Sequence, residues 1–156
     1  AANKIEEGQS QLDDAKEQVL YGLGHCHILK ISDNEIQWLT GKEDYTDGVN
    51  WIRERYNIPL ILVSMGKEGS RAYYNGMMVE AKPFLQKNTI ETTGAGDTFC
   101  GCSINGVLKY GLDNLDEAKL KEILTYANAG AALITMKKGA IRSMPEPENI
   151  KELIGE

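Results

Sequence analysis

A short apolar run, Leu60–Ser64, follows Pro59 and leads into a glycine-bearing turn at Met65–Ser70. The run is partly β-branched, which is typical of a strand buried on both faces. Segments with helical spacing of apolar residues lie before and after it. This alternation of strands and helices predicts an α/β fold with a largely parallel sheet, in a single domain that spans residues 1–156.

The other elements are expected from periodicity and from flanking Gly, Pro and capping residues. The expected helices cover 12–23, a brief segment capped by Ser32 or Asp33 and ending at Leu39, 44–56, 94–110, 114–136 and 147–154, and the expected strands cover 27–31, 60–64, 71–74 and 77–81. Asn75-Gly76 lies between the last two strands and is a strong hairpin signal. Asn114 with Glu117 resembles a capping box that would start the longest helix.

Composition narrows the class of protein. The 156 residues carry a net charge of −6 and no large cluster of Lys or Arg, so nucleic-acid binding through a basic face is not expected. No apolar stretch is long enough to span a bilayer, and the polar start, Ala1–Asp14, does not resemble a secretory signal. The three cysteines cannot all pair, which favours a reducing, cytoplasmic compartment.

Two further features are expected to be structural. His25-Cys26-His27 has its two imidazoles on one face of a strand and its thiol on the other, and no second cluster supplies ligands, so a strand-edge role is favoured over zinc. Trp38 and Trp51 occupy apolar helical positions and are expected in the core.

The segment Glu91–Phe99 is the richest in chemistry. Two glycines flank Ala95, so successive backbone N–H groups can converge on an anion where a helix begins. Asp97 supplies a carboxylate in the first turn of that helix. Phosphoryl transfer needs this combination of donors for the moving group and a base that orients the attacking hydroxyl. The alternative is a tight turn followed by an ordinary first-turn acid, because short glycine motifs often match by chance.

The same segment resembles the C-terminal signature of the ribokinase-like (PfkB) carbohydrate kinases, usually D-T-x-G-A-G-D. The resemblance implies that Gly94, Ala95 and Gly96 form an anion hole and that Asp97 is the catalytic base. Glu91 stands where the family usually has Asp, near a monovalent-cation site, so a K⁺ site stays an open alternative.

Three more segments resemble the family and follow in its order. Lys30–Glu35 with Leu39-Thr40-Gly41 is similar to its N-x-x-E segment and trailing L-T-G, which implies that Glu35 organises Mg²⁺ through water. The segment Leu62–Gly69 resembles the strand and turn that bracket the nucleotide. The helix and turn from 127 to 140 resemble those beside the adenine. The nucleotide contacts implied by these matches are Ser64, Gly66, Gly69, Asn128 and Gly139.

The resemblance implies a three-layer ribokinase-like fold, of which this chain is the C-terminal portion, and ATP-dependent phosphorylation of a sugar with Mg²⁺. Fructose is the favoured acceptor, with ribose or 2-keto-3-deoxygluconate as alternatives. The family's early G-G and D-P-N-x-R motifs are missing, and Ala1 is not Met, so a fragment or an inactive nucleotide-binding remnant is also considered. In a fragment, buried strands such as Leu60–Val63 would pair by self-association, as a dimer or aggregate.

Overall fold

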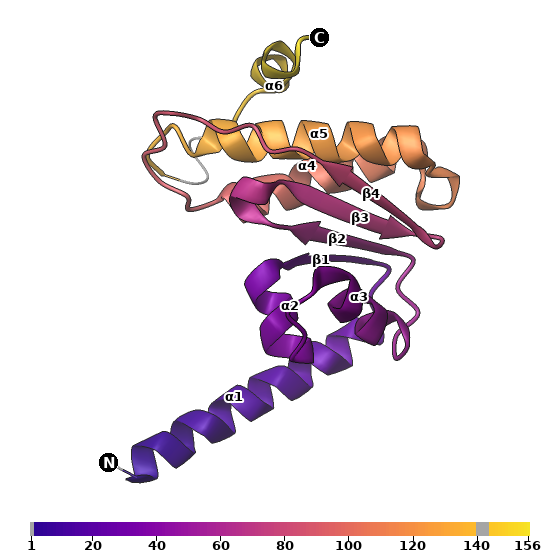
Figure 1. Ribbon diagram of the computed structural model, residues 1–156. Helices are drawn as coiled ribbons and strands as arrows, with labels where there is room; N and C mark the ends of the chain where they lie inside the picture. The colour runs from indigo at the N-terminus through magenta and orange to yellow at the C-terminus, as the bar shows by residue number, and fades with distance from the viewer. Residues whose placement is uncertain (1, 140–143) are drawn as a thin grey trace.

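The computed structural model describes residues 2–139 and 144–156, and side chains from Gly8 onward within those ranges. A four-stranded sheet lies between two layers of helices (Figure 1). The elements in chain order are α1 (Ala2–Leu23), β1 (Ile28–Ser32), α2 (Asp33–Thr40), α3 (Tyr45–Arg53), β2 (Leu60–Ser64), η1 (Gly66–Glu68), β3 (Ser70–Tyr74), β4 (Met77–Ala81), α4 (Ala95–Tyr110), η2 (Leu112–Asn114), α5 (Glu117–Ile134) and α6 (Pro147–Ile154).

The strands are ordered β1-β2-β3-β4. β1 pairs with β2 in parallel, with Ile28 opposite Leu60 and Ser32 opposite Ser64. β2–β3 and β3–β4 are antiparallel, so the described sheet is mixed and its parallel part is the β1–β2 pair. The difference from the largely parallel expectation arises at two turns: the chain reverses through η1 between β2 and β3, and again between β3 and β4, where Asn75 (φ 46°) and Gly76 (φ 77°) form a tight turn.

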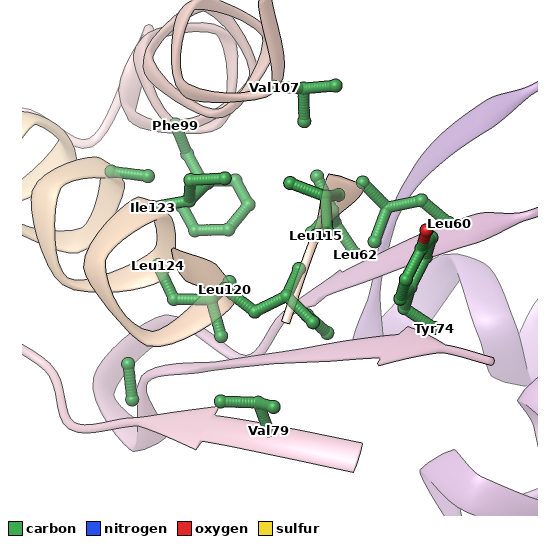
Figure 2. Close-up of a cluster of buried hydrophobic side chains, with 13 residues drawn as sticks. Leu60, Leu62, Tyr74, Val79, Phe99, Val107, Leu115, Leu120, Ile123 and Leu124 are labelled. Atoms are coloured by element: carbon green, nitrogen blue, oxygen red, sulfur yellow. The ribbon is translucent and has the colours of Figure 1, made fainter. Parts of the chain in front are cut away.

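Both faces of the sheet are buried because each strand divides its side chains between them. Leu60 and Leu62 face α4 and α5, where they join Phe99, Leu120 and Leu124 in one apolar cluster (Figure 2). Ile61 and Val63 point the other way and pack with residues of α1, α2 and α3. The three-layer prediction is therefore confirmed, and β2 is central as expected.

Helix ends follow local capping chemistry. Ser32 caps α2 in a reciprocal box with Glu35, and Gly41 closes the helix in the left-handed region at φ 70°. The expected cap of α5 is corrected: Asp116, not Asn114, accepts the Lys119 N–H at 2.8 Å. The Asn114 amide instead donates to the Tyr110 carbonyl, because η2 intervenes between the two helices.

The outer layer of α1–α3 is less buried than expected. α1 begins at Ala2 rather than near residue 12, and in Figure 1 it extends away from the sheet. Tyr21 on this helix is 75% exposed. Trp38 is 42% exposed, so its predicted core position is wrong. Trp51 is partly buried and packs against the apolar cluster between the sheet and helices α1–α3.

Candidate active site

A cleft of about 340 Å³ opens at the carboxyl end of β2. Its walls are the η1 turn, the connector between β4 and α4, the first turn of α4 and the second half of α5. The lining combines apolar side chains with a few polar ones, as is usual for a small-molecule site. The lining residues are Ser64, Gly66, Lys67, Gly69, Pro83, Phe84, Leu85, Gln86, Thr89, Thr92, Ala95, Gly96, Phe99, Asn128, Ala131, Ala132 and Thr135.

The first turn of α4 presents free backbone donors at this cleft. Gly94 precedes the helix at φ 84°, a conformation that glycine adopts without strain. The Ala95 N–H is used internally, donating to the Thr92 carbonyl at 3.1 Å. The N–H groups of Gly96 and Asp97 have no hydrogen-bond partner within residues 2–139 and 144–156. Of the expected donors Gly94, Ala95 and Gly96, the Ala95 N–H is therefore engaged and the Gly96 N–H is open. The Asp97 N–H is a further open donor, as the start of a helix favours.

The Asp97 side chain is solvent-exposed and directly follows the cleft-lining Gly96. Within the described part of the chain it forms no hydrogen bond or ion pair. An unengaged carboxylate beside open amides is the local arrangement that a base at a phosphate site requires.

Glu35 lies in the first turn of α2 and is not among the residues that line the cleft. Its Oε2 accepts the Ser32 N–H at 2.7 Å and lies 3.9 Å from Lys30 Nζ. Partial burial works to raise the pKa of Glu35, but the hydrogen bonds with Ser32 and the charge of Lys30 outweigh it and hold this pKa below the usual value. The carboxylate therefore stays ionised near neutral pH.

A directly ligated metal centre is not formed by the described residues, because no three His, Cys, Asp or Glu side chains converge. Mg²⁺ usually keeps several waters and binds through one or two carboxylates together with substrate phosphates. A single ionised carboxylate at Glu35, close to the start of α4, fits that mode.

The turn after β2 has two glycines with different surroundings. Gly66 (φ 53°) borders open space, whereas a Cβ on Gly69 (φ 100°) would overlap the Ala81 carbonyl oxygen and lie 3.1 Å from Pro83 N. The turn therefore approaches the connector closely, and together they form one end of the cleft with Ser64.

Asn128 is buried in α5, and its amide clamps the connector. Nδ2 donates to the carbonyls of Ala81 at 3.2 Å and Lys82 at 3.0 Å. This residue lines the cleft as expected from the sequence, but the structure adds a positioning role. An amide on an otherwise apolar helix face was the sequence signal for such a bond, although its partners could not be read from it.

Gly139 does not line the cleft. Its N–H donates to Glu91 Oε2 at 3.2 Å, and the hydrogen bonds from Thr93 and from Gly139 lower the pKa of Glu91. The N–H groups of Ile90 and Glu91 also donate to the Thr135 carbonyl. The segment before α4 is thereby tied to the end of α5. The expected turn partner Ala140 lies outside the described residues.

Sequence reasoning missed two groups of cleft residues. The connector supplies Pro83, Phe84, Leu85 and Gln86, which have no regular periodicity to mark them. Lys67 adds a cation to the lining. In sequence the connector residues resemble an ordinary surface loop, and only the fold of the connector across α5 brings them to the cleft, whereas Lys67 lies in the turn after β2 that the sequence already indicates.

The sheet, the cleft at the carboxyl end of β2 and the α4 turn define an α/β protein with a candidate small-molecule site, and the comparison with known families identifies the family. The chain belongs to the pfkB family of carbohydrate kinases, which it matches over residues 7–147. The described helices include none that is long and apolar enough to cross a membrane.

Fructokinases are among the similar curated proteins. The chain is 33% identical to probable fructokinase-4 of Arabidopsis thaliana over 142 residues, covering 91% of this chain and 43% of that protein. It is 35% identical to fructokinase-1 of Zea mays, again over 91% of this chain and 44% of the relative. The chain thus spans less than half the length of these relatives.

Solved structures show the same fold. A fructokinase from Vibrio cholerae O395, in a form bound to fructose, ADP and calcium ion, matches with a TM-score of 0.81 and 26% identity, covering 90% of this chain and 45% of that one. An Arabidopsis thaliana ribokinase complexed with ribose and ATP matches with a TM-score of 0.72 and 27% identity, and the match covers 85% of this chain and 42% of that one. The predicted ribokinase-like fold is confirmed.

Proposed function

We propose that this chain binds ATP in the cleft and supplies the phosphoryl-transfer residues of a sugar kinase, as its C-terminal portion. One observation carries the proposal: the cleft unites the turn after β2, through Ser64, Gly66 and Gly69, with Asn128 and the open first turn of α4. The carboxyl end of a parallel strand is where α/β sheets bind ligands. A nucleotide there would reach from the apolar wall of the connector and α5 to the α4 amides.

Phosphate would be held at the α4 end of the cleft. The N–H groups of Gly96 and Asp97 are free to donate to its oxygens, and the helix start favours negative charge. In this proposal Gly94 permits the turn and Ala95 shapes it. Asp97 accepts the proton of the sugar hydroxyl as that oxygen attacks the terminal phosphorus, and ADP leaves with the bridging oxygen.

The metal in this proposal is Mg²⁺, which when bound neutralises charge on the phosphates. Glu35 would hold it through water, since its Oε2 already accepts the Ser32 N–H. K⁺ is not part of the proposal, because Glu91 Oε2 accepts the Gly139 N–H.

Fructose is the acceptor that we favour, with fructose 6-phosphate as product. The support comes from the fructokinase names of the relatives and from the fructose-bound Vibrio structure. Ribose is the alternative with a specific observation behind it, because a ribose-bound ribokinase matches at 27% identity. The alternative acceptor 2-keto-3-deoxygluconate remains to be tested in a coupled assay for ADP.

A second candidate function is nucleotide binding without turnover. It is favoured by the share of the relatives that this chain spans, which is less than half. We expect the purified 156-residue chain to bind ATP but not to form ADP in response to fructose.

Titration calorimetry with ATP and a coupled assay for ADP separate these possibilities. Absence of ATP binding would reject the cleft as a nucleotide site. Fructose-dependent ADP formation by the chain alone would reject the binding-only alternative. In a longer protein that contains this chain, a preference for ribose over fructose would overturn the choice of sugar but not the kinase proposal.

A further inference from the structure

Lys30 is a charged residue on an otherwise apolar side of β1. Alternation along the strand places it with Ile28 on the side that faces α4 and α5, while Leu29 and Ile31 pack below the sheet. Its side chain is only 21% exposed. A half-buried ammonium is costly unless an anion compensates it.

The ammonium of Lys30 lies against the start of α4. Its Nζ is 3.4 Å from the position that a Cβ on Gly96 would occupy. The ammonium therefore lies beside Gly96, whose N–H is open, as is the N–H of the next residue, Asp97. Gly96 borders the cleft but Lys30 does not, so the ammonium sits just beyond the cleft, where the α4 turn opens toward β1.

This position is electrostatically unfavourable without a ligand. A helix start carries partial positive charge, so a cation beside it raises the free energy of the empty protein. The one ion-pair partner of Lys30 in the described chain is Glu35, at 3.9 Å, and that carboxylate is 58% exposed and already accepts the Ser32 N–H. This ion pair is too long and too exposed to water to compensate both the Lys30 ammonium and the partial positive charge at the start of α4. The arrangement is favourable when an anion bridges the ammonium and the amides.

We propose that Lys30 binds the terminal phosphate of ATP and stabilises the phosphoryl group during its transfer. The inference rests on the proposed nucleotide site and adds a residue to it. Because Lys30 lies beyond the cleft lining, it contacts the phosphate of ATP that is furthest from the adenine. In this role Lys30 transfers no proton and forms no covalent bond: its charge compensates the oxygens of the moving group, as cationic clamps do in phosphoryl transfer.

Binding of adenosine, ADP and ATP to the 156-residue chain in Mg²⁺ buffer tests this role. The variants are Lys30→Met, which removes the charge at similar length, and Lys30→Arg, which keeps it. Lys42→Met is the matched control, because Lys42 is exposed in the loop after α2. We expect Lys30→Met to weaken ATP binding on the order of 10- to 100-fold, ADP binding much less and adenosine binding hardly at all. Lys30→Arg should retain most of the ATP affinity, and the control all of it.

Thermal unfolding without ligand gives an independent readout. We expect Lys30→Met to unfold at the same or a higher temperature than the wild type, because it removes an uncompensated cation. Loss of stability, or equal weakening of adenosine and ATP binding, would assign Lys30 a structural role and overturn the inference. Unchanged ATP binding in Lys30→Met would overturn the role of Lys30 but would not affect the proposal that the cleft binds a nucleotide. Failure of the wild type to bind any of the three ligands would instead reject the nucleotide site and, with it, the role of Lys30.

Discussion

At the scale of single residues, the candidate site depends on polar groups that form no hydrogen bond with the described chain. Asp97 has an exposed carboxylate with no bond to the described chain, and the Gly96 N–H beside it is equally open. Such groups contribute little to folding, which is why they are available for chemistry. Their substitution should therefore affect turnover and stability separately.

Asp97→Asn tests the base directly. In a protein that contains this chain and phosphorylates sugar, we expect turnover to fall by ~10²–10⁴ while the unfolding temperature is unchanged, because the amide cannot accept the proton. Asp113→Asn, at an exposed position in η2, is the control and should leave turnover unaffected. Turnover at the wild-type level in Asp97→Asn would exclude Asp97 as the base.

Gly69 illustrates a residue fixed by a close approach. We expect Gly69→Ala to lower the unfolding free energy by about 2–3 kcal/mol, since it strains a φ of 100° and its Cβ meets the Ala81 carbonyl. Gly66→Ala, where nothing lies within 4 Å, should cost about 1 kcal/mol from its positive φ alone. Urea unfolding of both variants measures the difference, and equal costs would contradict the contact.

At the scale of elements, α5 and its C-cap residue Thr135 form hydrogen bonds to the two ends of the connector that borders the cleft. Asn128 binds the end of β4, and the Thr135 carbonyl binds the segment that enters α4. The connector between them has no regular structure, so these bonds give it its conformation. α2 contributes differently, because its capping box orients Glu35.

Asn128→Asp should loosen the connector. The variant keeps the shape of the side chain but replaces two bonds to the Ala81 and Lys82 carbonyls with repulsion between oxygens. We expect a loss of about 1–3 kcal/mol in unfolding free energy and weaker ATP binding. Asn105→Asp on the exposed face of α4 is the matched control. Equal stability of the two variants would show that the Asn128 hydrogen bonds do not contribute to the unfolding free energy.

The capping box of α2 predicts a pH dependence. The pKa of Glu35 is lower in the folded protein than its usual value of 4.5, so the ionised form stabilises the fold. This contribution is complete above the unfolded pKa and is lost as pH falls through the lower folded pKa. Glu35→Gln should therefore flatten the decline of unfolding free energy between neutral pH and about pH 3.

Unfolding by urea at several pH values measures this slope. Glu43→Gln, an exposed glutamate in the loop after α2, provides the comparison and should keep the wild-type slope. A slope in Glu35→Gln as steep as that of the wild type would show that the capping carboxylate does not contribute.

At the scale of the whole molecule, the outer strands β1 and β4 each have one edge that pairs with no strand of the described residues. Leu60–Val63, the strand that was expected to self-associate, is paired on both sides, so we now expect self-association through an outer strand and test β1. Ile104 and Leu108 are also exposed, along α4. An open edge and exposed apolar side chains favour self-association.

We expect the purified chain to form dimers or larger species as its concentration rises. Sedimentation velocity over a concentration series tests this, and hydrogen exchange locates the contact: amides of β1 should gain protection with concentration, while those of β3, already paired on both sides, should not. A monomer at the highest concentrations, with constant β1 exchange, would exclude pairing through this edge.

The sequence by itself determined features that depend on neighbours along the chain. The spans of β2, β4 and α6, the Asn75-Gly76 turn and the helix that begins after Gly94 all follow from local spacing and backbone preference, and Ser32 was one of the two residues expected to cap α2. The same local chemistry predicted a phosphate site at the turn before α4 with Asp97 beside it, because amides at a helix start and a nearby acid can be read from a few residues.

Only the tertiary structure decided which distant residues meet. It brought Lys30 to Gly96, bound Asn128 to the Ala81 carbonyl and moved the α5 cap to Asp116. Such contacts depend on how the layers pack on the sheet. Periodicity assigns a side chain to a face but does not say what lies across from it.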